Sequence, residues 1–451
     1  MKRRFFGTDG VRGPVGGPLI NPDFARRLGG AAARFFGQSY DGPRPGLVVI
    51  GRDTRASGVG LEAAVAAGVR AEGFTVVTVG VAPTPVVSFA VRRFSAAFGV
   101  VITASHNPAT DNGIKFFGPS GAKLRDEEEL TIESLLDSDG PPSTAGDSPS
   151  PERLEAVDLY ADHLVGLLPP QILKGWRIAV DCAHGASVST TPDVLRRLGA
   201  EVAAIGVEPD GSNINDGVGS QHPEGLAALV IRERANLGVA HDGDADRLVL
   251  VDETGSVLDG DELMAIVARQ ALAKGNLRHG TLVATVQSNL GLKVALEGWG
   301  GHLVQTSVGD RYVLESMLEG GFSIGGESSG HMIFLDISPS GDGLAAALKA
   351  IEAMIETGQP LSRLRTCLKR FPQLVRALTV ETKPPLESLD GLARAIADGE
   401  RILGGSGRIL LRYSGTEPKI RLLVEGPDPA RADAVMASLE RAVRNELTVR
   451  D

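Results

Sequence analysis

The segment Phe98-Gly-Val-Val-Ile-Thr-Ala-Ser-His-Asn-Pro108 joins an apolar run directly to a polar loop. Residues 98–103 form a short continuous apolar run, which is typical of a strand that is buried on both faces. Pro108 ends the strand pattern and shapes an exposed turn, because proline lacks the backbone N–H that a sheet needs. The segment therefore predicts a buried strand that presents Ser105 at its carboxyl end, where ligands gather in α/β folds.

This arrangement recurs twice more along the chain. Each copy contains a strand-like run, a helix-like segment, a second run, and a third run that ends in a polar loop. The runs lie at residues 47–50, 74–79 and 98–103, at residues 177–180, 201–205 and 237–240, and at residues 281–285, 302–306 and 322–324. Apolar runs that alternate with helical segments predict three similar α/β domains.

The pattern changes after about residue 370. Residues 374–380, 408–413 and 419–425 look like strands, and residues 389–402 and 430–445 look like helices. We therefore expect a smaller α+β domain at the C-terminus. The length of 451 residues fits about three or four domains. We place their boundaries at 1–150, 151–255, 256–369 and 370–451, with residues 138–151, rich in Ser, Pro, Asp and Gly, as the first linker.

The composition argues against several classes of protein. A net charge of −10 disfavours nucleic acid as the main partner, since phosphate backbones attract clustered Lys and Arg. No apolar run approaches the roughly 20 residues that a membrane helix needs. The two cysteines, Cys182 and Cys367, cannot form a disulfide framework. We therefore expect a cytoplasmic protein that binds neither nucleic acid nor a membrane.

Three alternating aspartates follow the third run of the second copy, in Asp242-Gly-Asp-Ala-Asp-Arg247. Three hard oxygen donors at this spacing suit Mg²⁺, and three carboxylates together without a cation would be unfavourable. A calcium loop would place Glu253 at its twelfth position, but Arg247 stands where such a loop needs glycine. A phosphatase that uses an aspartate as its nucleophile is a second interpretation. It leaves Arg247 unexplained, whereas an arginine is useful beside a phosphorylated ligand.

Ser105 can act as a nucleophile if it is activated, or it can carry a phosphate already. His106 follows it directly, Lys115 comes ten residues later, and Arg12 lies in the N-terminal motif Gly7-Thr-Asp-Gly-Val-Arg-Gly13. Any of the three could transfer protons or neutralise charge. Taken alone, a serine before His-Asn-Pro is usually a turn residue, and Lys115 is usually a surface charge.

The loop Gly325-Gly-Glu-Ser-Ser-Gly-His331 formally contains the Gly-x-Ser-x-Gly elbow of hydrolases. That elbow needs an acid and then a histidine further along the chain, but His331 is the last histidine and directly follows the motif, with no acid between them. The Glu327 carboxylate beside hydroxyl and imidazole groups suits the hydroxyls of a sugar better. A polar turn with a solvated Glu327 is the alternative.

A fourth polar loop, Arg412-Tyr-Ser-Gly-Thr-Glu-Pro418, joins two strand-like runs in the C-terminal segment. Two guanidinium groups, two hydroxyls and free backbone N–H groups can form a phosphate site. The residues concerned are Arg412, Ser414, Gly415, Thr416 and Arg421. A polar hairpin tip is the alternative for this loop.

Together and in this order, the four loops resemble the α-D-phosphohexomutase superfamily over essentially the whole chain. Gly7-Thr-Asp-Gly-Val-Arg-Gly13, Val308-Gly-Asp-Arg-Tyr-Val313 and Gly325-Gly-Glu-Ser-Ser-Gly-His331 are similar to its phosphoglucosamine mutase branch. Ala245 and Gln221 depart from the usual residues of that branch, but neither is a proposed ligand. The resemblance implies three similar α/β domains and a smaller α+β C-terminal domain, arranged as a heart around a central cleft.

The resemblance also implies a role for each loop. Ser105 matches the serine that carries a phosphoryl group, and its phosphate completes the Mg²⁺ site of Asp242, Asp244 and Asp246. The sugar-binding loop matches Glu327, Ser329 and His331, Arg247 lies beside the phosphorylated ligand, and the phosphate-binding loop matches Arg412, Ser414, Gly415, Thr416 and Arg421. The implied reaction converts glucosamine 6-phosphate to glucosamine 1-phosphate through a 1,6-bisphosphate, for amino-sugar nucleotide and cell-wall precursor synthesis.

Other functions stay open at this point. A phosphomannomutase/phosphoglucomutase would use the same loops, and a metal-dependent sugar phosphatase would release inorganic phosphate. A sugar-phosphate binding protein without activity would need neither a nucleophile nor a metal cage. We expect a small sugar phosphate as the partner, and we leave open whether two copies of the chain form a homodimer.

Overall fold

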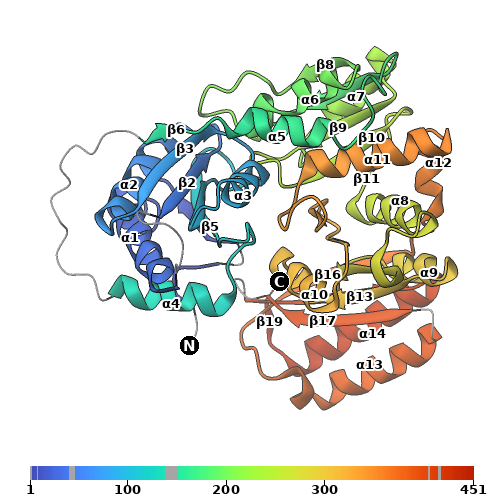
Figure 1. Ribbon diagram of the computed structural model, residues 1–451. Helices are drawn as coiled ribbons and strands as arrows, with labels where there is room; N and C mark the ends of the chain where they lie inside the picture. The colour runs from blue at the N-terminus through green and yellow to red at the C-terminus, as the bar shows by residue number, and fades with distance from the viewer. Residues whose placement is uncertain are drawn as a thin grey trace. The chain divides into compact units, whose positions relative to one another are not determined.

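The computed structural model describes residues 3–7, 9–39, 46–137, 151–404, 407–414 and 418–450 (Figure 1). The chain folds into two compact units. The first unit comprises Met1–Gln287 with Gly301–Cys367, and the second comprises Ser288–Gly300 with Leu368–Asp451. The predicted linker at 138–151 lies outside the described residues, except for its last position.

The first sheet confirms the predicted strands around Ser105. It has the order β1-β5-β4-β2-β3-β6. Its members are β1 (Val11–Pro14), β2 (Leu47–Arg52), β3 (Thr75–Val81), β4 (Phe98–Ile102), β5 (Asp111–Phe117) and β6 (Glu152–Arg153). Strand β2 pairs in parallel with β3 and β4, and β5 returns antiparallel to β4. The polar loop with Ser105 therefore connects two neighbouring strands.

Helices cover both faces of this sheet (Figure 1). They are α1 (Pro22–Ser39), α2 (Gly58–Ala71), α3 (Thr84–Arg93) and α4 (Asp126–Asp137). Val48 and Ile50 of β2 belong to the apolar core that α1 and α2 share. On the other face α3 lies very close, because a Cβ at Gly51 would fall 2.6 Å from a methyl carbon of Val87. The result is an α/β/α sandwich around strands that are buried on both faces.

Two further sheets of the first unit repeat this arrangement. Their strands are β7 (Arg177–Asp181), β8 (Glu201–Ile205), β9 (Leu237–His241), β10 (Leu248–Asp252) and β11 (Val257–Leu258), and then β12 (Thr281–Thr285), β13 (His302–Thr306), β14 (Ile324–Gly326) and β15 (Met332–Phe334). The helices with them are α5 (Ala156–Val165), α6 (Thr191–Arg197), α7 (Glu224–Glu233), α8 (Gly260–Ala273), α10 (Asp310–Gly320), α11 (Gly343–Thr357) and α12 (Leu361–Leu364). Short 3-10 turns lie at Ala186–Ser189, Arg278–Gly280 and Arg365–Cys367.

All three sheets share one topology. In each, the first strand of the copy lies in parallel between the other two, and the third strand turns back into an antiparallel partner. The three turning points are β4–β5, β9–β10 and β14–β15. Each carries one of the predicted functional loops, so three equivalent positions deliver three different sets of side chains.

The third strand of the last copy begins later than predicted. Residues 322–324 were expected to form it, but β14 runs from Ile324 to Gly326. Gly321 ends α10 in the left-handed conformation, and the backbone N–H of Phe322 still donates to the carbonyl of Met317. Phe322 therefore belongs to the end of the helix rather than to the sheet.

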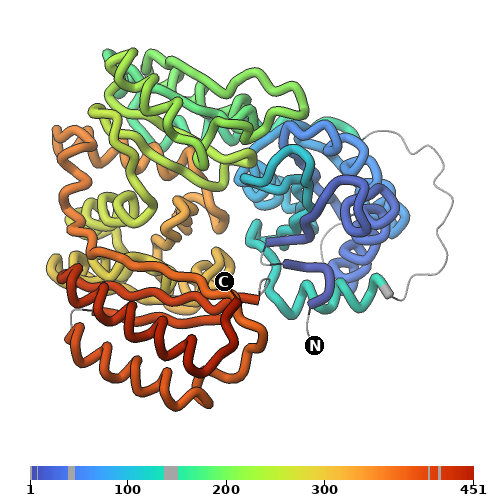
Figure 2. The backbone as a smooth tube through the Cα atoms, turned by 180° about the vertical axis from the view of Figure 1, so that it is seen from behind, coloured from blue at the N-terminus to red at the C-terminus, as the bar shows by residue number. Residues whose placement is uncertain are grey.

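The C-terminal unit is built on an antiparallel sheet with the order β17-β18-β16-β19. Its strands are β16 (Gln373–Val380), β17 (Arg408–Tyr413), β18 (Lys419–Glu425) and β19 (Val449–Arg450), and its helices are α9 (Leu290–Gly298), α13 (Asp390–Leu403) and α14 (Pro429–Glu446), with a 3-10 turn at Leu386–Ser388. Figure 2 shows α13 and α14 side by side along this sheet. Leu392, Val435 and Leu439 from the two helices belong to its apolar core.

Helix α9 was not expected in this unit, because in sequence it lies between two strands of the third α/β copy. Its N-cap Asn289 exchanges two hydrogen bonds with the backbone of Phe371, at 2.9 and 3.0 Å. The N–H of Leu290 donates to a carboxylate oxygen of Glu425 at 2.7 Å. These contacts hold the start of α9 in the C-terminal unit.

We keep the four-domain division of the chain as a proposal. The structure motivates a small shift of its boundaries, because β6 pairs with β3 and β11 pairs with β10. The first sheet thus reaches residue 153, and the second reaches residue 258.

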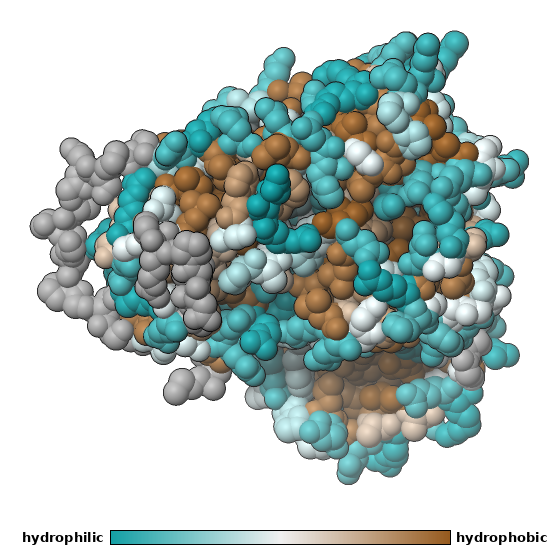
Figure 3. All heavy atoms as spheres, viewed as in Figure 1, coloured by the Kyte–Doolittle hydropathy of each residue, from teal (hydrophilic) through white to brown (hydrophobic). Residues whose placement is uncertain are grey.

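None of the described helices is long and apolar enough to cross a membrane. On the face seen in Figure 3, hydrophilic and hydrophobic residues are interspersed. Val59, Leu318 and Val375 are among the most exposed large hydrophobic residues, and each lies on a different element.

Candidate active site

Ser105 lies just beyond β4 with its side chain almost fully buried. Its φ of +54° is left-handed, which is uncommon for a residue with a Cβ. The Oγ atom donates to a carboxylate oxygen of Asp242 at 2.5 Å and lies 3.3 Å from Nδ1 of His106. The predicted nucleophile thus contacts both its neighbouring histidine and the aspartate loop of the second copy.

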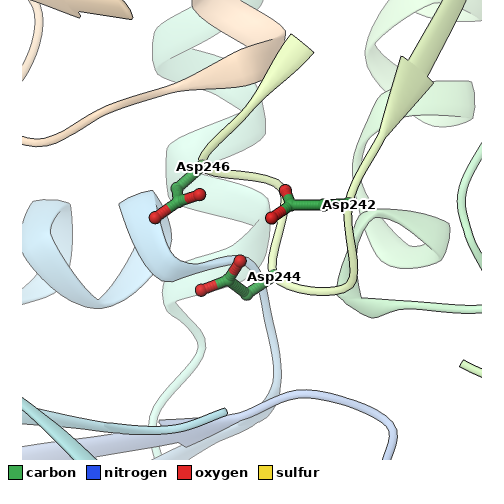
Figure 4. A group of neighbouring side chains, drawn as sticks. All are labelled: Asp242, Asp244 and Asp246. Carbon is green, nitrogen blue, oxygen red and sulfur yellow. The ribbon is translucent and has the colours of Figure 1, made fainter. Parts of the chain in front are cut away.

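The aspartates of the β9–β10 turn form a compact acidic cluster. Oxygen atoms of Asp242, Asp244 and Asp246 lie within 4.8 Å of one another. Figure 4 shows the three carboxylates turned toward a common space. All three side chains are buried, and no donor among the described residues bonds the Oδ1 atoms of Asp244 and Asp246.

This cluster fits a divalent cation. Burial, together with the charges of Asp244 and Asp246, raises the pKa of Asp242 to about 7. The three converging carboxylates also leave two oxygen atoms, on Asp244 and Asp246, without a hydrogen-bond donor among the described residues. A hard cation with oxygen ligands would bind these atoms, so the cluster can hold a metal ion.

Two side chains of the first domain orient Asp244. The hydroxyl of Thr84, in the first turn of α3, donates to its Oδ2 at 2.7 Å. Lys115 of β5 donates to the same atom at 2.8 Å, and its Nζ also lies 2.9 Å from Asp9 and 3.5 Å from Asp246. Burial would lower the pKa of Lys115, but these carboxylates outweigh it and raise that pKa. Lys115 is therefore a buried, protonated member of the cluster rather than a surface charge.

Sequence reasoning missed a second buried lysine, Lys123. Its Nζ lies 2.8 Å from Asp9 and 3.8 Å from Asp246, and it also pairs with Asp310. Asp9 and Asp310 lie in the motifs quoted above, Gly7 to Gly13 and Val308 to Val313, but their roles could not be read from those motifs. Nothing in the sequence distinguishes Lys123 as a site residue, because a single lysine after a turn is usually a surface charge.

The sugar-loop residues meet the aspartate loop directly. Nδ1 of His331 lies 3.6 Å from Asp246, and its Nε2 lies 3.3 Å from Asp310. Burial would lower the pKa of His331, but these two carboxylates raise it. Glu327 accepts from the N–H of Gly309 at 3.1 Å, and burial raises its pKa. A backbone bridge between Arg247 and His331 joins the two loops.

A cavity of about 420 Å³ opens beside these groups. Its lining comes from all three α/β copies and consists of Phe5, Gly7, Asp9, Gly10, Arg12, Lys123, Asp246, Arg247, Gln287, Val308, Gly309, Asp310, Glu327, Ser329 and His331. Arg12 pairs with Asp9, and Arg247 lies 3.9 Å from Asp246. Burial of the imidazole, together with the positive charges of Arg247 and Arg12, lowers the pKa of His106 to about 4. The cavity thus combines cations with hydrogen-bonding side chains, as a polar anionic ligand requires.

The C-terminal unit carries the remaining predicted residues. Arg412 and Arg421 are directly opposite each other on β17 and β18. Like charges in this position repel, and an anion near the pair would reduce that repulsion. The backbone N–H of Ser414 donates to the backbone carbonyl of Lys419, and the carbonyl of Ser414 accepts from the ammonium group of Lys383 at 2.5 Å. Gly415 and Thr416 lie outside the described residues.

Known proteins match the sequence of this chain over almost its whole length. Four family models match, described as phosphoglucomutase/phosphomannomutase α/β/α domains I, II and III and C-terminal domain, over residues 3–141, 158–255, 259–371 and 374–442. The phosphoglucosamine mutase of Anaeromyxobacter dehalogenans is 46% identical over 98% of this chain and 100% of that protein. The chain belongs to the phosphoglucomutase/phosphomannomutase family. The phosphoglucosamine mutase of Novosphingobium aromaticivorans is 47% identical over 98% of this chain and 99% of that protein.

Solved structures agree with the fold. A phosphoglucomutase/phosphomannomutase family protein from Burkholderia thailandensis superposes with a TM-score of 0.81 at 25% identity, over 98% of both chains. The N-acetylphosphoglucosamine mutase of Aspergillus fumigatus, solved with GlcNAc-6P and magnesium, gives a TM-score of 0.67 at 16% identity over 99% of this chain and 96% of that one. Three α/β domains and a smaller C-terminal domain are thus the architecture of this family, as the sequence predicted.

Proposed function

We propose that the chain is a phosphoglucosamine mutase, an isomerase that interconverts glucosamine 6-phosphate and glucosamine 1-phosphate. Phosphoglucosamine mutases 46 to 47% identical to the chain over almost its whole length support this function. The observation that carries the chemistry is the position of Ser105, whose Oγ lies 2.5 Å from a three-aspartate cluster next to a polar cavity.

The first transfer starts from Ser105 carrying a phosphoryl group. The free 1-hydroxyl of glucosamine 6-phosphate attacks the phosphorus, the bond to Oγ breaks, and glucosamine 1,6-bisphosphate forms. The hydroxyl proton must leave as the new bond forms. We assign its acceptance to His106, because the lowered pKa of this residue, about 4, leaves its imidazole neutral and able to accept a proton. Lys115 and Arg12 neutralise charge, since carboxylates raise the pKa of both above the usual value despite their burial.

The second transfer reverses the orientation of the sugar. The bisphosphate turns over, its 6-phosphoryl group returns to Ser105, and glucosamine 1-phosphate leaves. We assign the hydroxyls of the sugar to Glu327, Ser329 and His331, and the reacting phosphate to Arg247. Arg412, Ser414, Gly415, Thr416 and Arg421 are assigned to the phosphate that does not react. Positioning and electrostatics would then supply most of the catalysis.

Mg²⁺ is the ion that we propose for the aspartate cluster. Asp242, Asp244 and Asp246 would hold it with an oxygen of the Ser105 phosphate, and it would offset negative charge on the phosphoryl group. Thr84 and Lys115 keep Asp244 oriented before any ion binds.

Relative rates on three sugar phosphates test this function. We expect kcat/KM to be highest for glucosamine 6-phosphate when it is compared with glucose 6-phosphate and mannose 6-phosphate. A preference for glucose or mannose would assign the chain to the phosphomannomutase/phosphoglucomutase activity instead. Stoichiometric release of inorganic phosphate would identify a phosphatase.

A further inference from the structure

We propose that Asn215 is a positioning residue for the reaction at Ser105. Together with Arg55 it clamps two backbone carbonyls of the Ser105 loop, and it ties that loop to the aspartate loop of the second domain. This inference rests on the proposed function, because it concerns the efficiency of phosphoryl transfer at Ser105.

Arg55 forms the first half of the clamp. It follows β2, is fully buried, and its Nε donates to Asp53 at 2.9 Å. The other four N–H groups all point at backbone carbonyls of the Ser105 loop. The acceptors are Ser105 at 3.0 Å, Asn107 at 2.7 Å, Asp111 at 2.9 Å and Pro108. All five donors of the guanidinium are thus used, and four of them set the path of one loop.

Asn215 forms the second half from a different domain. Its side-chain nitrogen donates to the carbonyl of Ser105 at 2.9 Å and to that of Asn107 at 3.0 Å. Both belong to the four carbonyls that Arg55 bonds. Two carbonyl partners also fix which end of the amide faces the loop, since an amide oxygen there would meet only acceptors. Asn215 itself is buried, and its backbone N–H donates to Ala183 at 2.9 Å.

The clamp acts on a strained backbone. Ser105 has a φ of +54°, and a conformation of this kind persists only where surrounding contacts hold it. The N–H of Ser105 donates to the hydroxyl of Thr103 at 2.9 Å, which fixes one side of the residue. Arg55 and Asn215 fix its carbonyl on the other side. The direction of Oγ toward Asp242 therefore depends on both ends of the residue.

Asn215 also lies against the aspartate loop. A Cβ at Gly243 would come 2.6 Å from the carbonyl oxygen of Ser105 and 3.0 Å from the side-chain nitrogen of Asn215. Gly243 stands between two of the proposed metal ligands, Asp242 and Asp244. The serine loop, the aspartate loop and Asn215 thus meet at one point, and a shift of the amide would change the distance between nucleophile and acidic cluster.

Asn215→Asp tests this inference. The change keeps the shape of the side chain but places carboxylate oxygens against two carbonyls, so the Ser105 loop must move. We expect kcat for glucosamine 6-phosphate to fall by about 10- to 100-fold, because small misplacements of reacting groups have effects of this size. KM should stay within about twofold, since Asn215 does not line the cavity.

Asn213→Asp is the matched control in the same loop. Its side chain accepts from the N–H of Asp210 and donates to the carbonyl of Glu208, and neither of these hydrogen bonds involves the serine loop. We expect this variant to keep the wild-type kcat and KM. If Asn215→Asp does not fold, Asn215→Ala removes the same two donors without a new charge, and the same separation of kcat from KM applies.

The outcomes separate the two proposals. A wild-type protein that does not interconvert glucosamine phosphates would contradict the proposed function. An active wild type with an unchanged kcat in the Asn215 variant would overturn the clamp alone. A loss confined to KM, or an equal loss in Asn213→Asp, would also overturn it, because either result would show a general effect on the loop.

Discussion

At the scale of single residues, the sequence revealed the groups that stand in compact motifs. Ser105 and Asp242 could be found because each follows an apolar run that predicts a buried strand. Asp9, Lys123 and Asp310 could not be placed in the same way. Each is one charged residue on a different segment, and only the folding of the first α/β copy and its packing against the third bring the two aspartates within a few ångströms of Lys123. Burial of isolated charges depends on tertiary contacts that no local pattern encodes.

Ser105→Ala is the residue-scale prediction. Without Oγ no phosphoryl group can be carried, so turnover of glucosamine 6-phosphate should fall below detection. The Kd for the sugar phosphate, measured by calorimetry, should stay within about threefold of the wild-type value, because Ser105 is not among the residues that line the cavity. Activity like that of the wild type would exclude a covalent phosphoserine mechanism.

At the scale of elements, strands in short apolar runs were the best predicted. Strands β17 and β18 occupy the residues expected for them, and the loops at the ends of β4 and β9 follow the strands as predicted. Helix α9 shows where such reasoning stops. Its sequence position belongs to the third α/β copy, but Asn289 and Leu290 bond to Phe371 and Glu425 of the C-terminal unit. Neither the hydrophobic periodicity of a helix nor its capping residues indicate which sheet the helix packs against.

The crossing of α1 and α2 leads to a stability prediction. A Cβ at Gly68 of α2 would come 1.9 Å from the carbonyl oxygen of Arg26 in α1. Gly68→Ala should therefore destabilise the protein by about 2 kcal/mol or more, because the two helices must separate. Gly60→Ala in the same helix is the control, since its Cβ would meet nothing within 4 Å. It should raise stability by up to about 1 kcal/mol.

Thermal unfolding midpoints of the two glycine variants check this prediction. We expect the midpoint of Gly68→Ala to fall and that of Gly60→Ala to stay or rise. Equal midpoints would mean that the close approach of α1 and α2 contributes nothing to stability.

The N-terminus of α11 leads to a prediction about pH. Asp342 caps this helix by accepting from the N–H of Ala345 at 2.9 Å, and both its oxygens accept from the hydroxyl of Tyr160 at 2.9 Å. Burial raises the pKa of Asp342 to about 6. A carboxyl group with a raised pKa stabilises the fold in its protonated form. Its contribution is full below the unfolded pKa of about 4 and is lost as the pH rises through about 6.

Asp342→Asn removes this titration but keeps an oxygen for the cap. Relative to the variant, the wild type should lose about 2 kcal/mol of stability between pH 4 and pH 7. Unfolding midpoints of both proteins at these two pH values measure the effect. A difference between them that does not change with pH would show that Asp342 does not titrate in the folded protein over this range.

At the scale of the whole molecule, one topology is used three times to present three kinds of chemistry. The turns β4–β5, β9–β10 and β14–β15 carry the serine, the aspartates and the sugar-loop residues. Sequence reasoning predicted the repetition and the loops. It could not predict how the loops interlock, such as the hydroxyl of Thr84 on Asp244 or the backbone bridge between Arg247 and His331. These contacts join residues that are far apart in the chain and follow only from the packing of the three copies.

The ³¹P NMR spectrum of the purified protein with glucosamine 6-phosphate, Mg²⁺ and a trace of glucosamine 1,6-bisphosphate tests the central claim most directly. We expect a glucosamine 1-phosphate signal to grow to a constant level without inorganic phosphate, and EDTA to stop its growth because the aspartate cluster would lose its ion. Growth of inorganic phosphate instead, or no conversion of the amino sugar at all, would contradict a phosphoglucosamine mutase.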